Sequence, residues 1–243
     1  METVRLVTVF QFRYNRFSFS GDSMSVSTQS TLSVKRILLT MAILLLVPVL
    51  RRVVSMFISI EAIADMFSLN ITAWILILYD WNLLGVHYNR AKDHIGEAVL
   101  WTVIGIVFLS IWLFVNERFL KAPLPIDHVT EAAAYPGALP PVLIAYSFSQ
   151  AALINIGFKC MTDHFNVRSQ EVLVILLSGF AFGLYYTLLF TPASLHIFIP
   201  VYLYNILAIA FSAYLYNQSH SFVPGMAAMT IVYFLYQILI LSA

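Results

Sequence analysis

Residues 98–116 read AVLWTVIGIVFLSIWLFVN and contain no charged side chain. A helix needs about 20 mostly apolar residues to cross the hydrocarbon core of a bilayer. This stretch therefore predicts a membrane-spanning helix. It decides how the rest of the chain is interpreted, because similar stretches recur along the sequence.

The composition of the whole chain is that of an integral membrane protein. Of its 243 residues, 60% are hydrophobic and 10% are charged, and the mean hydropathy is +0.85. Soluble domains carry about 25% charged residues, and so little charge cannot cover a globule of this size. The formal net charge of +1 gives no reason to expect a nucleic-acid partner. We expect the lipid bilayer to surround the protein.

Seven apolar stretches predict an all-α, polytopic transmembrane bundle of about seven (six to eight) helices. They form a single domain over residues 37–243, preceded by a basic and polar segment, residues 1–36. The first 23 residues lack the apolar core of a secretory signal, and a start at Met24 is an alternative. The predicted spans are 37–59, 70–87, 98–116, 138–158, 171–190, 195–216 and 222–241.

Basic residues divide unevenly between the two predicted sides. One side holds only Arg118 and Lys121. Because cytoplasmic loops are enriched in Lys and Arg, we expect the N-terminus in the cytoplasm and the C-terminus outside. The nine basic residues of the predicted cytoplasmic side are Arg5, Arg13, Arg16, Lys35, Arg36, Arg90, Lys92, Lys159 and Arg168.

Three intramembrane charges need an explanation, since a charge at the bilayer centre costs at least about 2.5 kcal/mol. Arg51 and Arg52 interrupt span one. Either one long helix turns them toward the bundle or the membrane surface, which we prefer, or an interfacial helix over 51–67 follows Leu50. Asp80 lies inside predicted span two, and Asn82 or the two arginines are its expected partners. It either orders the helices or belongs to a functional pathway.

The chain carries no complete catalytic or metal-binding motif. There is no GxSxG, Walker A or HExxH sequence, and the six histidines are scattered through loops and helix ends. The single cysteine, Cys160, cannot form an internal disulfide. We expect no metal and no cofactor.

Three segments together show a characteristic spacing of glycine, proline, serine and aromatic residues. Residues 151–158 read AALINIGF, residues 182–186 read FGLYY, and residues 221–233 read SFVPGMAAMTIVY. Over 151–241 this layout resembles the membrane core of the CPBP (Abi) family, which includes CAAX prenyl endopeptidases and bacteriocin-processing or self-immunity proteins. The first family motif is EExxxR, followed by Gly and an apolar residue, and the second is FxxxH. The third is a helix that opens with Ser, two apolar residues and Pro and continues with HxxxN. Matching positions are Gly157, Phe158, Phe182, Gly183, Ser221 and Pro224.

The resemblance extends to the glycine, phenylalanine, serine and proline positions of the motifs but not to the catalytic residues. The glutamate positions hold Ala151 and Ala152, which offer no acidic proton. Tyrosine at a histidine position is a poor general base near neutral pH, because its reference pKa is about 10. The remaining motif positions are occupied by Ile156 for arginine, Tyr186 and Met229 for histidine, and Tyr233 for asparagine.

We therefore expect a pseudoenzyme of this family, a CAAX protease-like protein that binds a membrane protein or peptide partner. Bacteriocin self-immunity and assembly of a partner complex are both compatible, and the resemblance implies a bacterial plasma membrane. The binding cavity is predicted at the motif positions Ala151, Ala152, Ile156, Phe182, Tyr186, Met229 and Tyr233, with Gln150, Asn155 and Tyr185 as further lining residues.

Two alternatives stay open. An active intramembrane metalloprotease would need rearranged catalytic residues. A small transporter or channel component would use Asp80, Arg51 and Arg52 as pathway residues. Within the second segment, Gly179 and Gly183 are four residues apart, so we expect a neighbouring helix to approach closely there.

Overall fold

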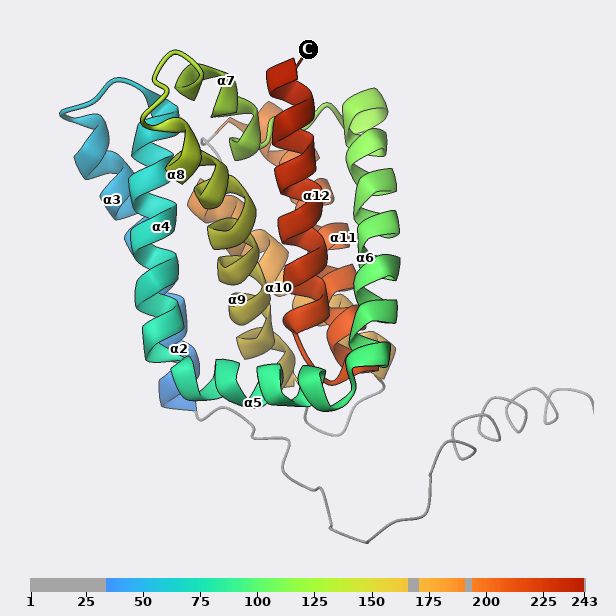
Figure 1. Ribbon diagram of the computed structural model, residues 1–243. Helices are drawn as coiled ribbons and strands as arrows, with labels where there is room; N and C mark the ends of the chain where they lie inside the picture. Colours follow the sequence, from blue (N-terminus) through green and yellow to red (C-terminus); the bar gives the residue numbers. More distant parts are fainter. Residues whose placement is uncertain (1–33, 166–170, 191–193, 243) are drawn as a thin grey trace, which may run out of the picture. The chain divides into compact units, whose positions relative to one another are not determined.

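The computed structural model describes residues 34–165, 171–190 and 194–242, and their regular structure is entirely helical (Figure 1). The expected all-α membrane bundle is confirmed. Seven helices of the described part are long and apolar enough to cross a membrane: Val34–Ser55, Glu61–Tyr79, Ile95–Leu120, Leu139–Lys159, Glu171–Leu189, Leu195–Ser219 and Val223–Ser242.

Several spans consist of more than one helical element. The first comprises α2 (Val34–Leu44) and α3 (Leu46–Ser55), and the second is α4 (Glu61–Tyr79). After α5 (Trp81–Asp93), α6 (Ile95–Val115) ends in a π-helical turn, η1 (Asn116–Leu120). The remaining elements are η2 (Pro125–His128), α7 (Val129–Ala132), α8 (Leu139–Ile144), η3 (Ala145–Ser149), α9 (Gln150–Phe165), α10 (Glu171–Phe190), α11 (Leu195–Ser219) and α12 (Val223–Ser242).

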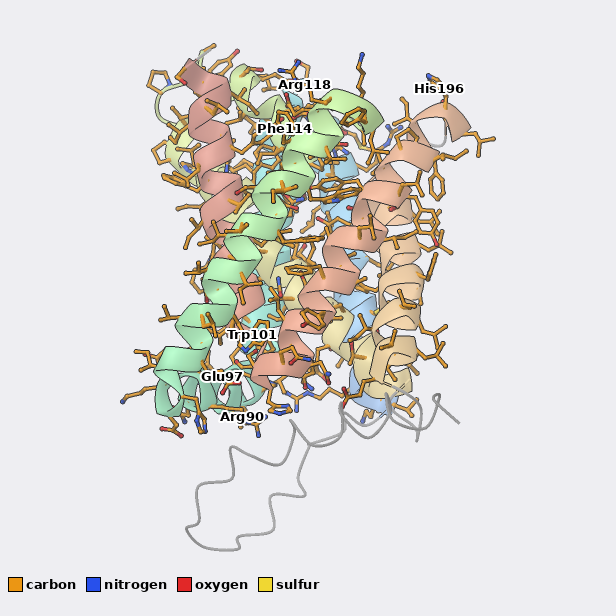
Figure 2. All side chains as sticks on the ribbon, turned by 90° about the vertical axis from the view of Figure 1, so that its right-hand side faces the viewer. Arg90, Glu97, Trp101, Phe114, Arg118 and His196 are labelled. Carbon is orange, nitrogen blue, oxygen red and sulfur yellow. The ribbon has the colours of Figure 1, made fainter. Side chains whose placement is uncertain are left out.

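The bundle has two ends that the site description below distinguishes (Figure 1). The α5 end holds α5 and the start of α2, and α5 lies across the spans there. The α7 end holds α7 and the C-terminus of α12. Figure 2 shows the same division along α6, with Arg90 and Glu97 at one end, Arg118 and His196 at the other, and Trp101 and Phe114 inward of them. Polar groups thus lie at both ends of an apolar band.

The predicted boundaries of span two are wrong. The span is Glu61–Tyr79 rather than 70–87, and residues 81–93 form the separate helix α5. Glu61 and Asp65 lie in the first two turns of this span, and Arg51 of the preceding helix pairs with both carboxylates. Asp80 consequently lies at the junction of α4 and α5 rather than inside a span.

Span one follows the preferred prediction of one long helix, although it ends at Ser55 instead of residue 59. A short break at Leu45 separates α2 from α3. Pro48 explains it, because a proline ring clashes with the carbonyl four residues earlier and cannot donate to it. Arg51 turns toward the bundle and Arg52 is exposed. The alternative interfacial helix over 51–67 is not formed.

The placement of these arginines weakens the charge argument for sidedness. Arg51 and Arg52 join Arg118 and Lys121 at the α7 end, so that end holds four of the nine basic residues in the described part of the chain rather than two. Arg5, Arg13, Arg16 and Arg168 lie outside the described residues. A cytoplasmic N-terminus stays a prediction.

Glycines let the helices approach as expected. A Cβ on Gly179 would lie 2.7 Å from Ala210 Cβ, and one on Gly183 would lie 3.3 Å from the Ile206 backbone. The close approach of another helix, α11, is therefore confirmed. Gly157 of α9 lies against the ring of Phe182, where an added Cβ would be 2.3 Å away. Gly157 and Phe182 are both positions that match the family motifs, and this contact brings them together.

Candidate functional site

A cavity of about 190 Å³ lies at the α7 end of the bundle. Its walls come from α3, α4, the segment 123–128, and α9 to α12. The segment reaches this position because Asn116 closes the turn after η1: its amide donates to Ala122 O (3.1 Å) and its side-chain oxygen accepts from Ala122 N (3.2 Å). Lys121 completes the turn in the left-handed region, with a φ of 49°.

The floor of the cavity is polar and deeply buried. Its lining includes Gln150, Tyr186, Tyr204, Asn205 and Tyr233, none more than 6% exposed. The hydroxyls of Tyr204 and Tyr233 lie 3.3 Å apart. Gln150 lies beside Tyr186, and its side-chain oxygen Oε1 is buried without a hydrogen-bond partner among the residues that the structure describes. The floor thus offers an unused acceptor.

Charged residues gather at the mouth in what we call the Asp65 network, defined as Arg51, Glu61, Asp65, His128 and Tyr146. Arg51 binds Asp65 through Nε (2.8 Å) and Glu61 through Nη2 (3.0 Å). His128 Nδ1 lies 3.3 Å from Asp65 and 3.5 Å from Glu61. The Tyr146 hydroxyl donates to Asp65 over 2.9 Å. A buried carboxylate is costly unless it is paired and hydrogen-bonded, and Asp65 has three such contacts.

The network has more acid than base. Glu131 adds a third carboxylate, which accepts from the backbone N–H of Ala62 at the start of α4 (3.2 Å). The hydrogen bond to Asp65 raises the pKa of His128 above its usual range, against the burial of its ring, and Glu61 and Glu131 add to the rise. The mouth of the cavity therefore lies in a negative field.

Four of the predicted site residues line this cavity, although they are distant in sequence: Arg51, Gln150, Tyr186 and Tyr233. Each comes from a different helix. The tertiary structure thus brings Tyr186 of the segment 182–186 and Tyr233 of the segment 221–233 together at one floor.

The other predicted cavity residues are packed around the floor and do not line it. Phe182 packs against Tyr186, with ring centroids 6.2 Å apart, and the Asn155 amide lies 3.9 Å from Met229 Sδ. The Tyr185 hydroxyl donates to the Met41 carbonyl over 2.6 Å. Ala151, Ala152 and Ile156 are fully buried in α9.

Asp80 belongs to the opposite end. It is fully buried, pairs with Arg36 at 2.8 Å and accepts from Thr40 at 3.4 Å. The predicted partners Arg51 and Arg52 are wrong, because 15 residues of helix separate Arg36 from Arg51, about 22 Å at 1.5 Å per residue. Asp80 and the arginine pair therefore do not form one pathway site.

Sequence reasoning missed Glu61, Asp65, Tyr146, Tyr204 and Asn205. One signal was available: Glu61 and Asp65 are four residues apart and share a helix face. Tyr146 could not be found this way, since its position depends on the π-helical turn η3, a feature that is frequent at functional sites. Over residues 34–165, 171–190 and 194–242, no three His, Cys, Asp or Glu side chains are placed to hold a metal ion.

The fold and this cavity define a helical integral membrane protein with a polar, buried pocket at one end. Comparison with protein-family models, curated proteins and solved structures finds no match. The family resemblance rests on the residues named above.

Proposed function

We propose that the protein is a non-catalytic, CPBP-like membrane protein that binds a membrane protein or peptide partner through the cavity at the α7 end. The observation that carries the proposal is the shared floor: Gln150, Tyr186 and Tyr233, from three helices, line one buried space. Ligand pockets for whole small molecules span roughly 300–1,000 Å³. A cavity of about 190 Å³ suits one side chain or one chain end of a larger partner.

The side chains around the floor favour contact over chemistry. Ala151 and Ala152, at the glutamate positions of the resembling family, are buried in packing and cannot activate water. Tyrosines provide large apolar surfaces together with a polar tip, which is the character of many binding sites. An accessory or assembly subunit, or a bacteriocin self-immunity protein in a bacterial plasma membrane, agrees with this arrangement.

One observation favours a second candidate function, an intramembrane hydrolase with rearranged residues. His128 lies between two carboxylates beside the cavity, and a histidine oriented by a carboxylate is a common acid–base arrangement. Peptide cleavage by the purified protein, abolished in His128→Gln, would support this candidate over binding alone.

Site-specific photo-crosslinking in membranes tests the proposal. A photoreactive residue at Val201 would face the cavity, and one at Leu203 on the same helix would face outward. We expect a discrete adduct of defined mass from position 201 that is absent from position 203. The adduct should disappear when Gln150→Met and Tyr233→Phe are added. The same adducts from both positions, or none from position 201, would contradict binding in the cavity.

A further inference from the structure

The charges at the cavity mouth do not balance. Of the charged groups there, Glu61, Asp65 and Glu131 are acidic and Arg51 is basic. Arg51 lines the cavity but pairs with two carboxylates at once, so its positive charge is compensated. Even with His128 protonated, one negative charge remains. Such a field attracts a cation and repels an anion.

A second, independent feature lies on the floor. Gln150 is 6% exposed, and its Oε1 is an acceptor with no hydrogen-bond partner among the described residues. A buried polar atom without a partner is rare and calls for an explanation. Because Gln150 Oε1 is an acceptor, it is suited to a hydrogen-bond donor of a ligand.

The aromatic residues of the floor also suit a cation. Tyr186, Tyr204 and Tyr233 line the same space. A cation within about 6 Å of such a ring gains about 0.5–2 kcal/mol, more when water is excluded. Negative field, acceptor and aromatic faces thus all favour one chemical class.

We infer that the cavity takes the protonated amine of a peptide, either its N-terminus or a lysine side chain. The inference rests on the proposed function and names the group that this site recognises. The ammonium enters past Glu61, whose side chain is 59% exposed, and donates to Gln150 Oε1. An ethanolamine lipid headgroup has the same ammonium, but its phosphate would lie in the negative field of the mouth.

Direct binding to the full-length protein in detergent tests the inference. The probes are n-butylammonium, alanyl-alanine amide, its N-acetyl form and phosphoethanolamine, measured at pH 7 by saturation-transfer NMR. We expect the first two to bind and the acetylated dipeptide to bind at least about tenfold more weakly. Glu61→Gln and Gln150→Met should each weaken binding of the amines by about tenfold, which corresponds to about 1.4 kcal/mol.

Glu171→Gln is the matched control, since Glu171 is an exposed glutamate that begins α10 and accepts from Asn217. It should leave binding unchanged. Equal binding of the acetylated dipeptide, or unchanged binding in Glu61→Gln, overturns the inference. If phosphoethanolamine binds more tightly than alanyl-alanine amide, the ammonium does not come from a peptide, and that part of the inference is overturned. A crosslink at position 201 without amine binding rejects this inference alone, whereas absence of both rejects the proposed function as well.

Discussion

The buried carboxylates at the two ends of the bundle have different surroundings. At the α5 end, Asp80 is fully buried, pairs with Arg36 and accepts a hydrogen bond from Thr40. At the α7 end, Asp65 shares Arg51 with Glu61, and a cavity lies directly beside them. The comparison teaches that a buried ion pair enclosed by packed side chains serves the fold, whereas one that adjoins a cavity marks a candidate site.

The largest test compares two acid-to-amide changes. We expect Asp65→Asn to lower the free energy of unfolding by about 3 kcal/mol, because a neutral amide weakens the contacts of the buried carboxylate with Arg51, His128 and Tyr146 together. Asp80→Asn should cost less, since Asp80 has two side-chain partners and Asp65 has three. Unfolding in mixed detergent micelles measures both. A larger loss for Asp80→Asn would reverse the comparison.

Two histidines should give opposite pH dependences. Burial, aided by Lys159 and Arg90, lowers the pKa of His87 at the α5 end to about 3. The unfolded chain then binds the proton more readily, so stability falls as pH drops below about 6.5, by about 2 kcal/mol at pH 5. His128 has a raised pKa, so its contribution is complete below about pH 6.5 and is lost as pH rises through the folded value.

The corresponding experiment follows the unfolding free energy from pH 5 to pH 8 in His87→Gln and His128→Gln. The first variant should lose the acid-side destabilisation, and the second should lose the alkaline-side one. Identical pH profiles for the two variants would refute the difference between the ends.

A smaller effect on stability should distinguish a polar group that is hydrogen-bonded within the fold from a polar atom that has no partner there. Thr40→Val removes a hydrogen bond to Asp80 and should cost about 1 kcal/mol. Gln150→Met removes an oxygen acceptor that has no partner in the described structure together with a hydrogen bond to Tyr186, so we expect a smaller loss than for Thr40→Val. The same loss in both variants, measured by detergent unfolding, would mean that Gln150 stabilises the fold rather than serving a ligand.

The smallest expected change in stability is that of Arg52→Met, which is compared with the same change at the neighbouring Arg51. Arg52 is exposed at the end of α3, so Arg52→Met should change stability by less than about 0.5 kcal/mol. Arg51→Met removes the only arginine that pairs with Asp65 in the described residues, and it should be clearly destabilising. Equal effects in the same unfolding assay would contradict the inward orientation of Arg51.

Most spans were predictable from sequence because each helix enters the bilayer by its own hydrophobicity. Residues 171–190 and 195–216 match the observed helices closely. The error at 70–87 concerns the segment that holds Glu61 and Asp65, whose carboxylates pair with Arg51 of another helix. A window of local hydropathy contains no information on such a partner.

The sequence by itself determined the class of protein, the number of spans and the close approach at Gly179 and Gly183. These features depend on composition and spacing within single helices. Only the tertiary structure decided that Gln150, Tyr186 and Tyr233 share a floor and that Arg51 and His128 meet at its mouth. The physical reason is that a site between helices depends on their relative rotation and on the path of segment 123–128. Contacts among distant residues set both.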